Sequence, residues 1–122
     1  MLREAYGIKK IVIVCGRTDL RKGLDGLSAL VRLRYGMDPL EEGTLFLFCG
    51  GRRDRIKALT YEGTGFCLCY MRLTDGCFQW PSTPDEARDI TLEQYRRLMD
   101  GFTIDGSIRD TRITQKKAVK IQ

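Results

Sequence analysis

Apolar residues gather in several short runs that have the length and composition of β-strands. Two runs, Lys9–Cys15 and Thr44–Cys49, are apolar at almost every position, which is typical of strands covered on both faces of a sheet. We therefore expect both strands to be buried and the first to be central. In the run Thr44–Cys49, Phe46 and Phe48 should lie on the same face of the strand.

Between these runs the apolar positions recur at spacings of three and four, which predicts a helix with one stripe packed on the sheet. Thr18 is a suitable N-cap for a helix that starts at Asp19, and Gly36 should end it. Gly23 and Gly26 would lie inside this helix at a cost of up to about 1 kcal/mol each. Either tight packing on the sheet or close approach of a phosphate backbone would explain them. The stripe consists of Leu20, Leu24, Leu27, Val31 and Tyr35.

The segment 52–72 predicts a hairpin whose two-residue turn is Gly63-Thr64. Its two strands then present eight side chains on one face. The tip of this face is apolar and the other end is basic and aromatic, with two arginines directly opposite each other, a repulsion that Asp54, another carboxylate or a bound anion would relieve. The register pairs Tyr61 with Phe66, Leu59 with Leu68, Lys57 with Tyr70, and Arg55 with Arg72.

A second turn at Asp75-Gly76 predicts a further strand, Phe78–Trp80, paired with residues 71–73. Together with the hairpin, this strand would complete a core on the opposite face. The expected core residues are Ile56, Ala58, Cys67, Cys69, Met71, Leu73, Phe78 and Trp80.

After Pro81 and Pro84 the acidic stretch Asp85–Asp89 suggests a solvated linker. A second helix should follow, because Thr91 and Gln94 form a capping box. Its expected apolar stripe is Leu92, Tyr95, Leu98 and Met99, and Gly101 should close it.

These elements predict an α+β fold: one domain, residues 1–106, built on a mostly antiparallel sheet of about five strands. One long helix should pack on the sheet, and a short helix should lie near the C-terminus. Residues 107–122 are charged and nearly free of large apolar side chains, so we expect a basic, flexible tail.

Charge adds a possible partner to this picture. The chain has 21 basic and 16 acidic residues and no histidine, for a net charge of +5. Residues 1–74 carry 13 basic and 8 acidic side chains, residues 75–105 carry 3 and 7, and residues 106–122 carry 5 and 1. Two basic regions are compatible with a phosphate-rich partner. Without an apolar run of about 20 residues or a signal-peptide core, we expect a cytoplasmic protein and no membrane partner.

The chain offers little catalytic or metal-binding chemistry. The absence of histidine excludes Ser-His and Cys-His catalysis, and no glycine motif for nucleotide phosphates is present. The five cysteines lie mostly in apolar runs and are expected to be reduced core residues, with no zinc site. Asp19, Asp54 and Glu62 could hold a magnesium ion, but each has a simpler structural role. We therefore expect no enzyme activity, metal or cofactor.

A basic surface with interleaved aromatic residues suits phosphate contacts and a stacked base. We expect this surface to lie on the hairpin and on nearby loops. The candidate nucleic-acid-binding residues are Arg52, Arg53, Arg55, Lys57, Tyr70 and Arg72, supported by Arg17, Arg21 and Lys22.

Several ordered motifs resemble those of a known family. They run Asp19-Leu-Arg-Lys-Gly-Leu-Asp-Gly-Leu, Phe46-Leu-Phe-Cys-Gly-Gly-Arg-Arg-Asp-Arg-Ile-Lys, Glu62-Gly-Thr-Gly-Phe, Arg72-Leu, and Phe78-Gln-Trp-Pro. The chain resembles the TnpB accessory proteins of insertion-sequence-66-type bacterial transposable elements, which are distinct from the RNA-guided nuclease of the same name.

This resemblance implies a non-catalytic protein that assists DNA transposition, with strand-transfer chemistry in a separate transposase. Two partners follow. The protein could bind the DNA of the element ends through its basic surface, and would then be associated with the nucleoid. Alternatively, it could be an adaptor for the transposase, engaged through the acidic segment 85–105 or through the apolar hairpin tip, Leu59, Tyr61, Phe66 and Leu68.

Overall fold

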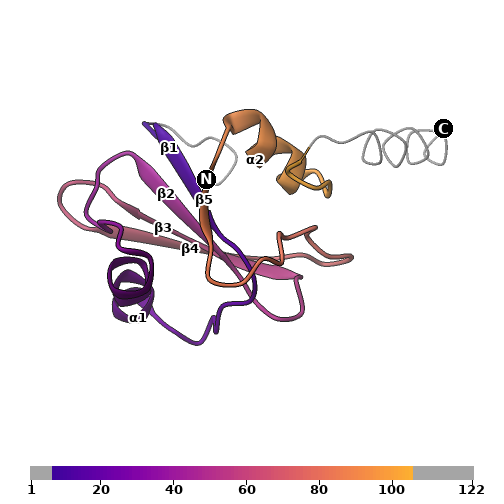
Figure 1. Ribbon diagram of the computed structural model, residues 1–122, viewed down its shortest axis with the longest axis horizontal. Coiled ribbons are helices and arrows are strands. Elements are labelled where there is room, and N and C mark those ends of the chain that lie inside the picture. Colours follow the sequence, from indigo (N-terminus) through magenta and orange to yellow (C-terminus); the bar gives the residue numbers. More distant parts are fainter. Residues whose placement is uncertain (1–6, 106–122) are drawn as a thin grey trace.

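A computed structural model describes residues 7–105 and shows a five-stranded sheet with helices on both faces (Figure 1). The strand order is β4-β3-β2-β1-β5. Strands β1 and β2 are parallel, and every other neighbouring pair is antiparallel. The predicted α+β class is confirmed. The strands are β1 Lys10–Val14, β2 Thr44–Cys49, β3 Arg55–Tyr61, β4 Phe66–Arg72 and β5 Ala87–Ile90.

One helical segment connects the two parallel strands and covers one face of the sheet (Figure 1). It consists of the α-helix α1, Leu24–Ala29, and the π-helical turn η1, Leu30–Arg34. Gly36, at φ 63°, follows it, as predicted. The predicted stripe does face the sheet: Leu27 and Val31 are buried there, with the other stripe residues packed around them. The core on this face also contains Val12, Val14, Phe46, Phe48 and Leu59.

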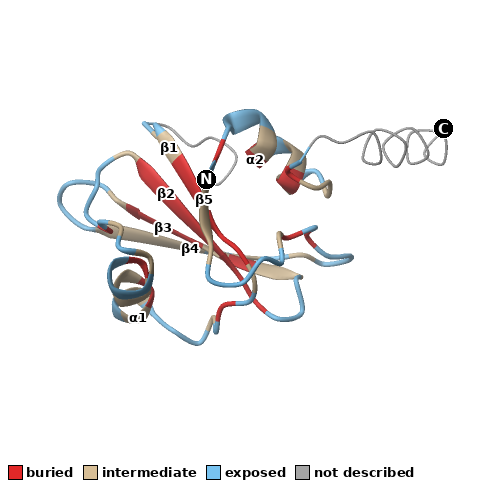
Figure 2. Ribbon diagram, viewed as in Figure 1, coloured by how far each residue is buried: buried red, intermediate tan, exposed pale blue. Residues whose placement is uncertain are grey.

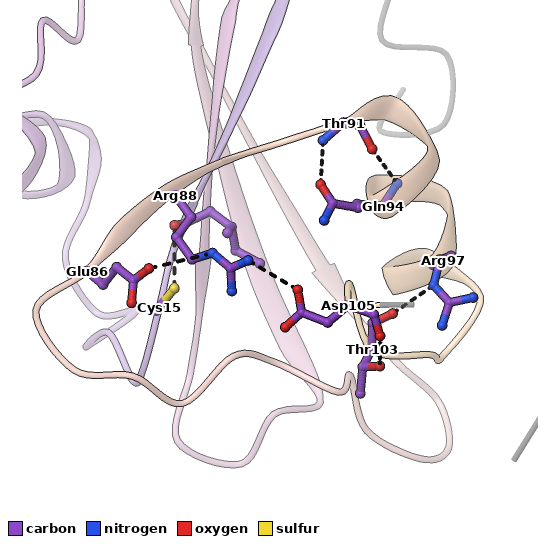
Figure 3. Close-up of polar contacts among 9 residues, drawn as sticks. Cys15, Glu86, Arg88, Thr91, Gln94, Arg97, Thr103 and Asp105 are labelled. Atoms are coloured by element: carbon purple, nitrogen blue, oxygen red, sulfur yellow. Dashed lines mark hydrogen bonds and ion pairs between the residues drawn. The ribbon is translucent and has the colours of Figure 1, made fainter. Parts of the chain in front are cut away.

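The opposite face is covered by helix α2, Leu92–Met99, and by an irregular segment from the 73–86 loop. The capping box at Thr91 and Gln94 is confirmed, with reciprocal bonds of 3.0 and 2.8 Å (Figure 3). Leu92, predicted to be part of the apolar stripe, is instead exposed. Figure 2 shows that burial is concentrated in the central strands. The core on this face includes Ile13, Leu47, Ile56, Ala58, Phe78, Trp80, Tyr95, Leu98 and Ile104.

The predicted start of the first helix is wrong by five residues. The helix begins at Leu24 with Gly23 as its N-cap. Thr18 is buried, and its backbone N–H donates to the carbonyl of Cys49 at the end of β2. Asp19 accepts a bond from the backbone of Arg21, which makes a local turn in place of a helix end. These contacts hold the segment before Leu24 across the end of the sheet.

Neither glycine of this region packs closely on the sheet, and only Gly26 has a close neighbour. Gly23 has open space around its missing Cβ. At Gly26 a Cβ would lie 3.1 Å from the Cβ of Lys22, so the close neighbour is the preceding loop and not the sheet. Gly26 therefore gives room to the loop that precedes the helix.

The hairpin is confirmed in every pair. Tyr61 lies opposite Phe66, and the register continues without a bulge to Arg55 opposite Arg72. Asp54 resolves the repulsion between the two arginines, because its carboxylate lies 3.0 Å from the Nε of Arg55. The expected core face is also confirmed at most positions, although Cys67 is only half-buried and lies outside the cluster.

The predicted strand Phe78–Trp80 is wrong, because the chain folds over the end of β3 instead of pairing with β4. The backbone N–H of Leu73 donates to Asp54 O and that of Phe78 to Arg53 O, both at 2.7 Å. The side chains of Phe78 and Trp80 nevertheless enter the core as expected. Trp80 is anchored by a 2.9 Å bond from its Nε1–H to Val14 O.

The fifth strand is β5, in a stretch that was predicted to be a solvated linker. It pairs antiparallel with the open edge of β1, with Ile90 opposite Ile11. Arg88 of this strand forms two ion pairs (Figure 3). Its Nε lies 3.5 Å from Glu86 Oε1, and its Nη2 lies 3.2 Å from Asp105 Oδ1. The unpaired backbone groups at the edge of the buried strand β1 thus select β5 as a strand, even though the sequence of β5 is polar. The predicted tail, 107–122, lies outside the described residues.

Candidate nucleic-acid interface

A wide groove of about 1010 Å³ lies on the α1 face of the sheet, beside the loop that precedes α1. Three segments form it: the 17–21 loop, the turn after β2, and the facing ends of β3 and β4. Of the nine candidate nucleic-acid-binding residues, six line it. The lining residues are Arg17, Thr18, Asp19, Leu20, Arg21, Gly50, Gly51, Arg52, Arg55, Lys57, Leu68 and Tyr70.

The turn Gly50-Gly51 forms part of the groove because its residues carry no side chains. A Cβ on Gly50 would lie 3.3 Å from Leu20 Cδ1 and 3.4 Å from Arg55 Cγ. A Cβ on Gly51 would lie 3.0 Å from the Cδ of Arg17. Neither glycine has a positive φ, so space and not backbone conformation is the reason for them. The two glycines let one arginine from each side lie against the turn.

One wall of the groove is the loop before α1. Arg21 forms a two-pronged ion pair with Asp19, with both N–O distances at 2.9 Å. This contact lowers the pKa of Asp19 to about 2, so the carboxylate stays charged at neutral pH. The loop is tied to the sheet by Lys57, whose Nζ donates to the carbonyl oxygen of Lys22 at 3.1 Å. Lys57 therefore fixes the distance between the loop and β3.

The other wall comes from β3 and β4. Arg55 is half-buried, and its ion pair with Asp54 lowers the pKa of that carboxyl group. Tyr70, on the neighbouring strand β4, adds a smaller contribution to the raised pKa of Arg55 after the larger effect of Asp54. Tyr70 itself is 54% exposed. The wall thus presents an aromatic ring next to a fixed positive charge.

Two arginines in the groove keep their full charge available to a ligand. Within residues 7–105, neither Arg17 nor Arg52 forms an ion pair with a carboxylate, and both are exposed. Asp19 is the one acidic side chain among the lining residues, and Arg21 already neutralises it. The groove therefore carries a net positive charge, and its arginine and lysine side chains supply hydrogen-bond donors.

A smaller hollow of about 250 Å³ adjoins the groove across the Gly50-Gly51 turn. Arg17 and both glycines line the two cavities alike. The small hollow adds Arg53, which adopts a left-handed backbone at φ 60°. Both backbone groups of Arg53 are bonded, its N–H to Gly50 O and its carbonyl to the N–H of Phe78. This network fixes an unfavourable conformation for a non-glycine residue.

The remaining candidates lie outside the large groove. Lys22 contributes its carbonyl group as the acceptor for Lys57, and its side chain passes beside Gly26. Arg72 lies opposite Arg55 in the hairpin but is not among the lining residues. Gly50-Gly51 and Thr18 also belong to this site, although the sequence indicated only a turn at the glycines and a helix N-cap at Thr18. Thr18 is buried at the groove, where its backbone N–H donates to the carbonyl of Cys49. The adjacent glycines next to arginines were the available signal.

The apolar hairpin tip is mostly packed against the rest of the domain. Leu59 is 0% exposed, and Phe66 and Leu68 pack on the core beneath α1. Tyr61 and Phe66 contact each other edge to face, with ring centroids 5.1 Å apart. The four residues that could engage a protein partner therefore do not form one exposed patch.

The described part of the chain has neither a membrane-spanning helix nor a cluster of metal-binding side chains. From residue 7 to residue 105, no helix is both long and apolar enough to cross a membrane. Over the same range, no three His, Cys, Asp or Glu side chains come together in a way that could hold a metal ion.

The fold and the groove define a small α+β domain with a basic surface cleft. Comparison with known proteins gives the family. Residues 9–108 match the model of the family described as IS66 Orf2 like protein, and the chain belongs to this family. The resemblance to the TnpB proteins of IS66-type elements is thereby confirmed, together with a role accessory to transposition.

Two proteins of Sinorhizobium fredii are similar to most of the chain. Uncharacterized protein y4hO is 35% identical over 93 residues, which cover 76% of this chain and 80% of that protein. Uncharacterized protein y4jC is 32% identical over 102 residues, which cover 84% and 86%. No solved structure matches the chain.

Proposed function

We propose that this protein is a non-catalytic accessory factor of transposition that binds the DNA of its element through the basic groove. The observation that carries this proposal is the convergence of five cations from three separate segments on one cavity. Such cations supply affinity by displacing counterions from phosphates, without reading the base sequence. Sequence choice would then belong to the transposase or to the shape of the DNA ends.

The first test uses the two arginines that have no carboxylate partner within the described residues. Arg17→Gln combined with Arg52→Gln should weaken DNA binding. It should also make the negative slope of log K against log salt shallower by roughly 1.4–1.8, since each phosphate contact contributes about 0.7–0.9. Binding would be measured by fluorescence anisotropy between about 50 and 200 mM salt.

The matched control removes the same charge elsewhere. Arg32→Gln combined with Arg96→Gln changes two exposed arginines, on η1 and α2, that do not line the groove. This control should keep most of the affinity and most of the slope. Equal losses in the two double variants would mean that net charge alone drives binding and would contradict the groove as the site.

We also propose that DNA, rather than the transposase, is the direct partner. Packing of Leu59, Phe66 and Leu68 against the core leaves little apolar surface at the hairpin tip for a protein interface. After nuclease treatment, the transposase of the element should not co-purify with the protein. Stable co-purification without nucleic acid would favour the adaptor role instead.

A further inference from the structure

The shape of the groove bears on which form of DNA it accepts. Proteins that read duplex DNA project a helix or a two-stranded ribbon into a major groove about 12 Å wide. Here the cations line a concave site, whose volume of about 1010 Å³ is at the upper end of the roughly 300–1,000 Å³ typical of small-ligand sites. A concavity of this size suits a short stretch of one strand better than the convex surface of a duplex.

Tyr70 supplies the second feature that an unpaired strand needs. It is the one aromatic residue among those that line the groove, and it is 54% exposed. It lines the groove together with Arg55, which is itself fixed by Asp54. A base can stack on an aromatic ring of this kind only when it is not already stacked inside a duplex.

The cations also continue beyond the groove. Arg17 and the Gly50-Gly51 turn border both the groove and the smaller hollow, where Arg53 and Ser82 lie. Arg17 therefore lines both cavities, and Arg53 adds a further cation on the other side of the glycine turn. Successive cations beside an aromatic ring are the arrangement used to bind single strands.

We propose that the groove binds an unpaired nucleic-acid strand, with one base stacked on Tyr70 and the adjoining phosphates on Arg17, Arg52 and Arg53. This inference rests on the proposed function and narrows it to single-stranded DNA, such as a frayed or processed element end. Duplex DNA would contact only the rim of the groove.

The test compares two labelled DNAs with the full chain at one salt concentration: a mixed-sequence single strand and the same sequence as a blunt duplex. We expect the single strand to bind at least about tenfold more tightly. Tyr70→Ala should weaken single-strand binding by about 5- to 150-fold, the range for loss of one stacked base, and should change duplex binding little. Tyr70→Phe keeps the ring and should bind the single strand with the affinity of the wild type.

Three further measurements separate stacking from structural damage. Tyr70→Thr removes the ring but keeps a residue that favours strands, so it should be folded and should bind as weakly as Tyr70→Ala. Leu33→Ala changes a residue that is 76% exposed and lies outside the groove, and should bind normally. Photo-cross-linking with iodouracil-substituted single strands should label the peptide that contains Tyr70.

The outcomes distinguish this inference from the proposed function. Equal or tighter binding of the duplex, or an unchanged single-strand affinity in both ring-deleted variants, would overturn the inference and leave DNA binding by the groove intact. A cross-link confined to peptides away from the groove would overturn it as well. Failure of the protein to bind either DNA would remove both proposals.

Discussion

Trp80 is the anchor of the irregular segment 73–86, and its replacement should show how much that anchor contributes to stability. The side chain is 5% exposed, and its Nε1–H donates to Val14 O at 2.9 Å. Trp80→Ala removes a nearly buried aromatic ring, for which the typical cost is about 3–5 kcal/mol. Trp80→Phe keeps most of the apolar contact but loses the hydrogen bond.

Loss of that bond leaves a buried carbonyl group without its indole donor, which costs about 1–3 kcal/mol. We therefore expect Trp80→Phe to lower the free energy of unfolding by about 2 kcal/mol. With a urea m-value of about 1–3 kcal/mol/M, the midpoint should fall by roughly 0.7–2 M.

The assay is urea unfolding followed by far-UV circular dichroism, because Trp80 is the single tryptophan of the chain and its fluorescence is lost in both variants. Leu33→Ala, at a position that is 76% exposed, is the control and should stay within about 0.5 kcal/mol of the wild type. A Trp80→Phe variant as stable as this control would refute the reasoning that the indole bond holds the segment.

Four further results are expected. Asp19→Asn keeps the turn acceptor but frees Arg21, so DNA affinity measured by anisotropy should rise by a few-fold at low salt; a fall would contradict the assigned charge balance. The folded-state pKa of Asp19 is lowered from 3.8 to about 2. The stability that the charged Asp19 adds to the fold is therefore present above about pH 4 and is lost between about pH 4 and 2. The unfolding midpoints of Asp19→Asn and wild type should converge over this range. Iodoacetamide at pH 8 should label the exposed Cys77 and spare Cys49, whose pKa burial raises to about 12; equal labelling by mass spectrometry would argue against that burial. Thr91→Ala should lower the free energy of unfolding by about 1 kcal/mol through loss of the cap, whereas Thr91→Ser should not.

Local patterns were sufficient where neighbours in space are also neighbours in the chain. The hairpin register follows from the Gly63-Thr64 turn and a side-chain period of two, so each of its pairs could be predicted. The cap of α2 is likewise a contact over three residues. The stripe under α1 follows from helical spacing, even though the helix starts later than predicted.

The errors arose where distant contacts compete with local preference. Thr18 looks like an N-cap, but its backbone bonds to Cys49 at the end of β2, and the loop up to Lys22 is held to the sheet by Lys57. Likewise the open edge of β1 selects β5 as its partner, although the charged stretch 85–89 carries little strand signal of its own.

The amino-acid sequence by itself determined which residues are apolar, where the turns fall, which cations lie near the hairpin, and which family the chain resembles. Only the tertiary structure decided which of those cations meet. Arg17 and Arg21 come from a loop, and Arg52 and Arg55 from a distant turn and strand. They share one groove because the parallel crossover between β1 and β2 brings the loop beside Gly50-Gly51, and no local pattern encodes that crossover.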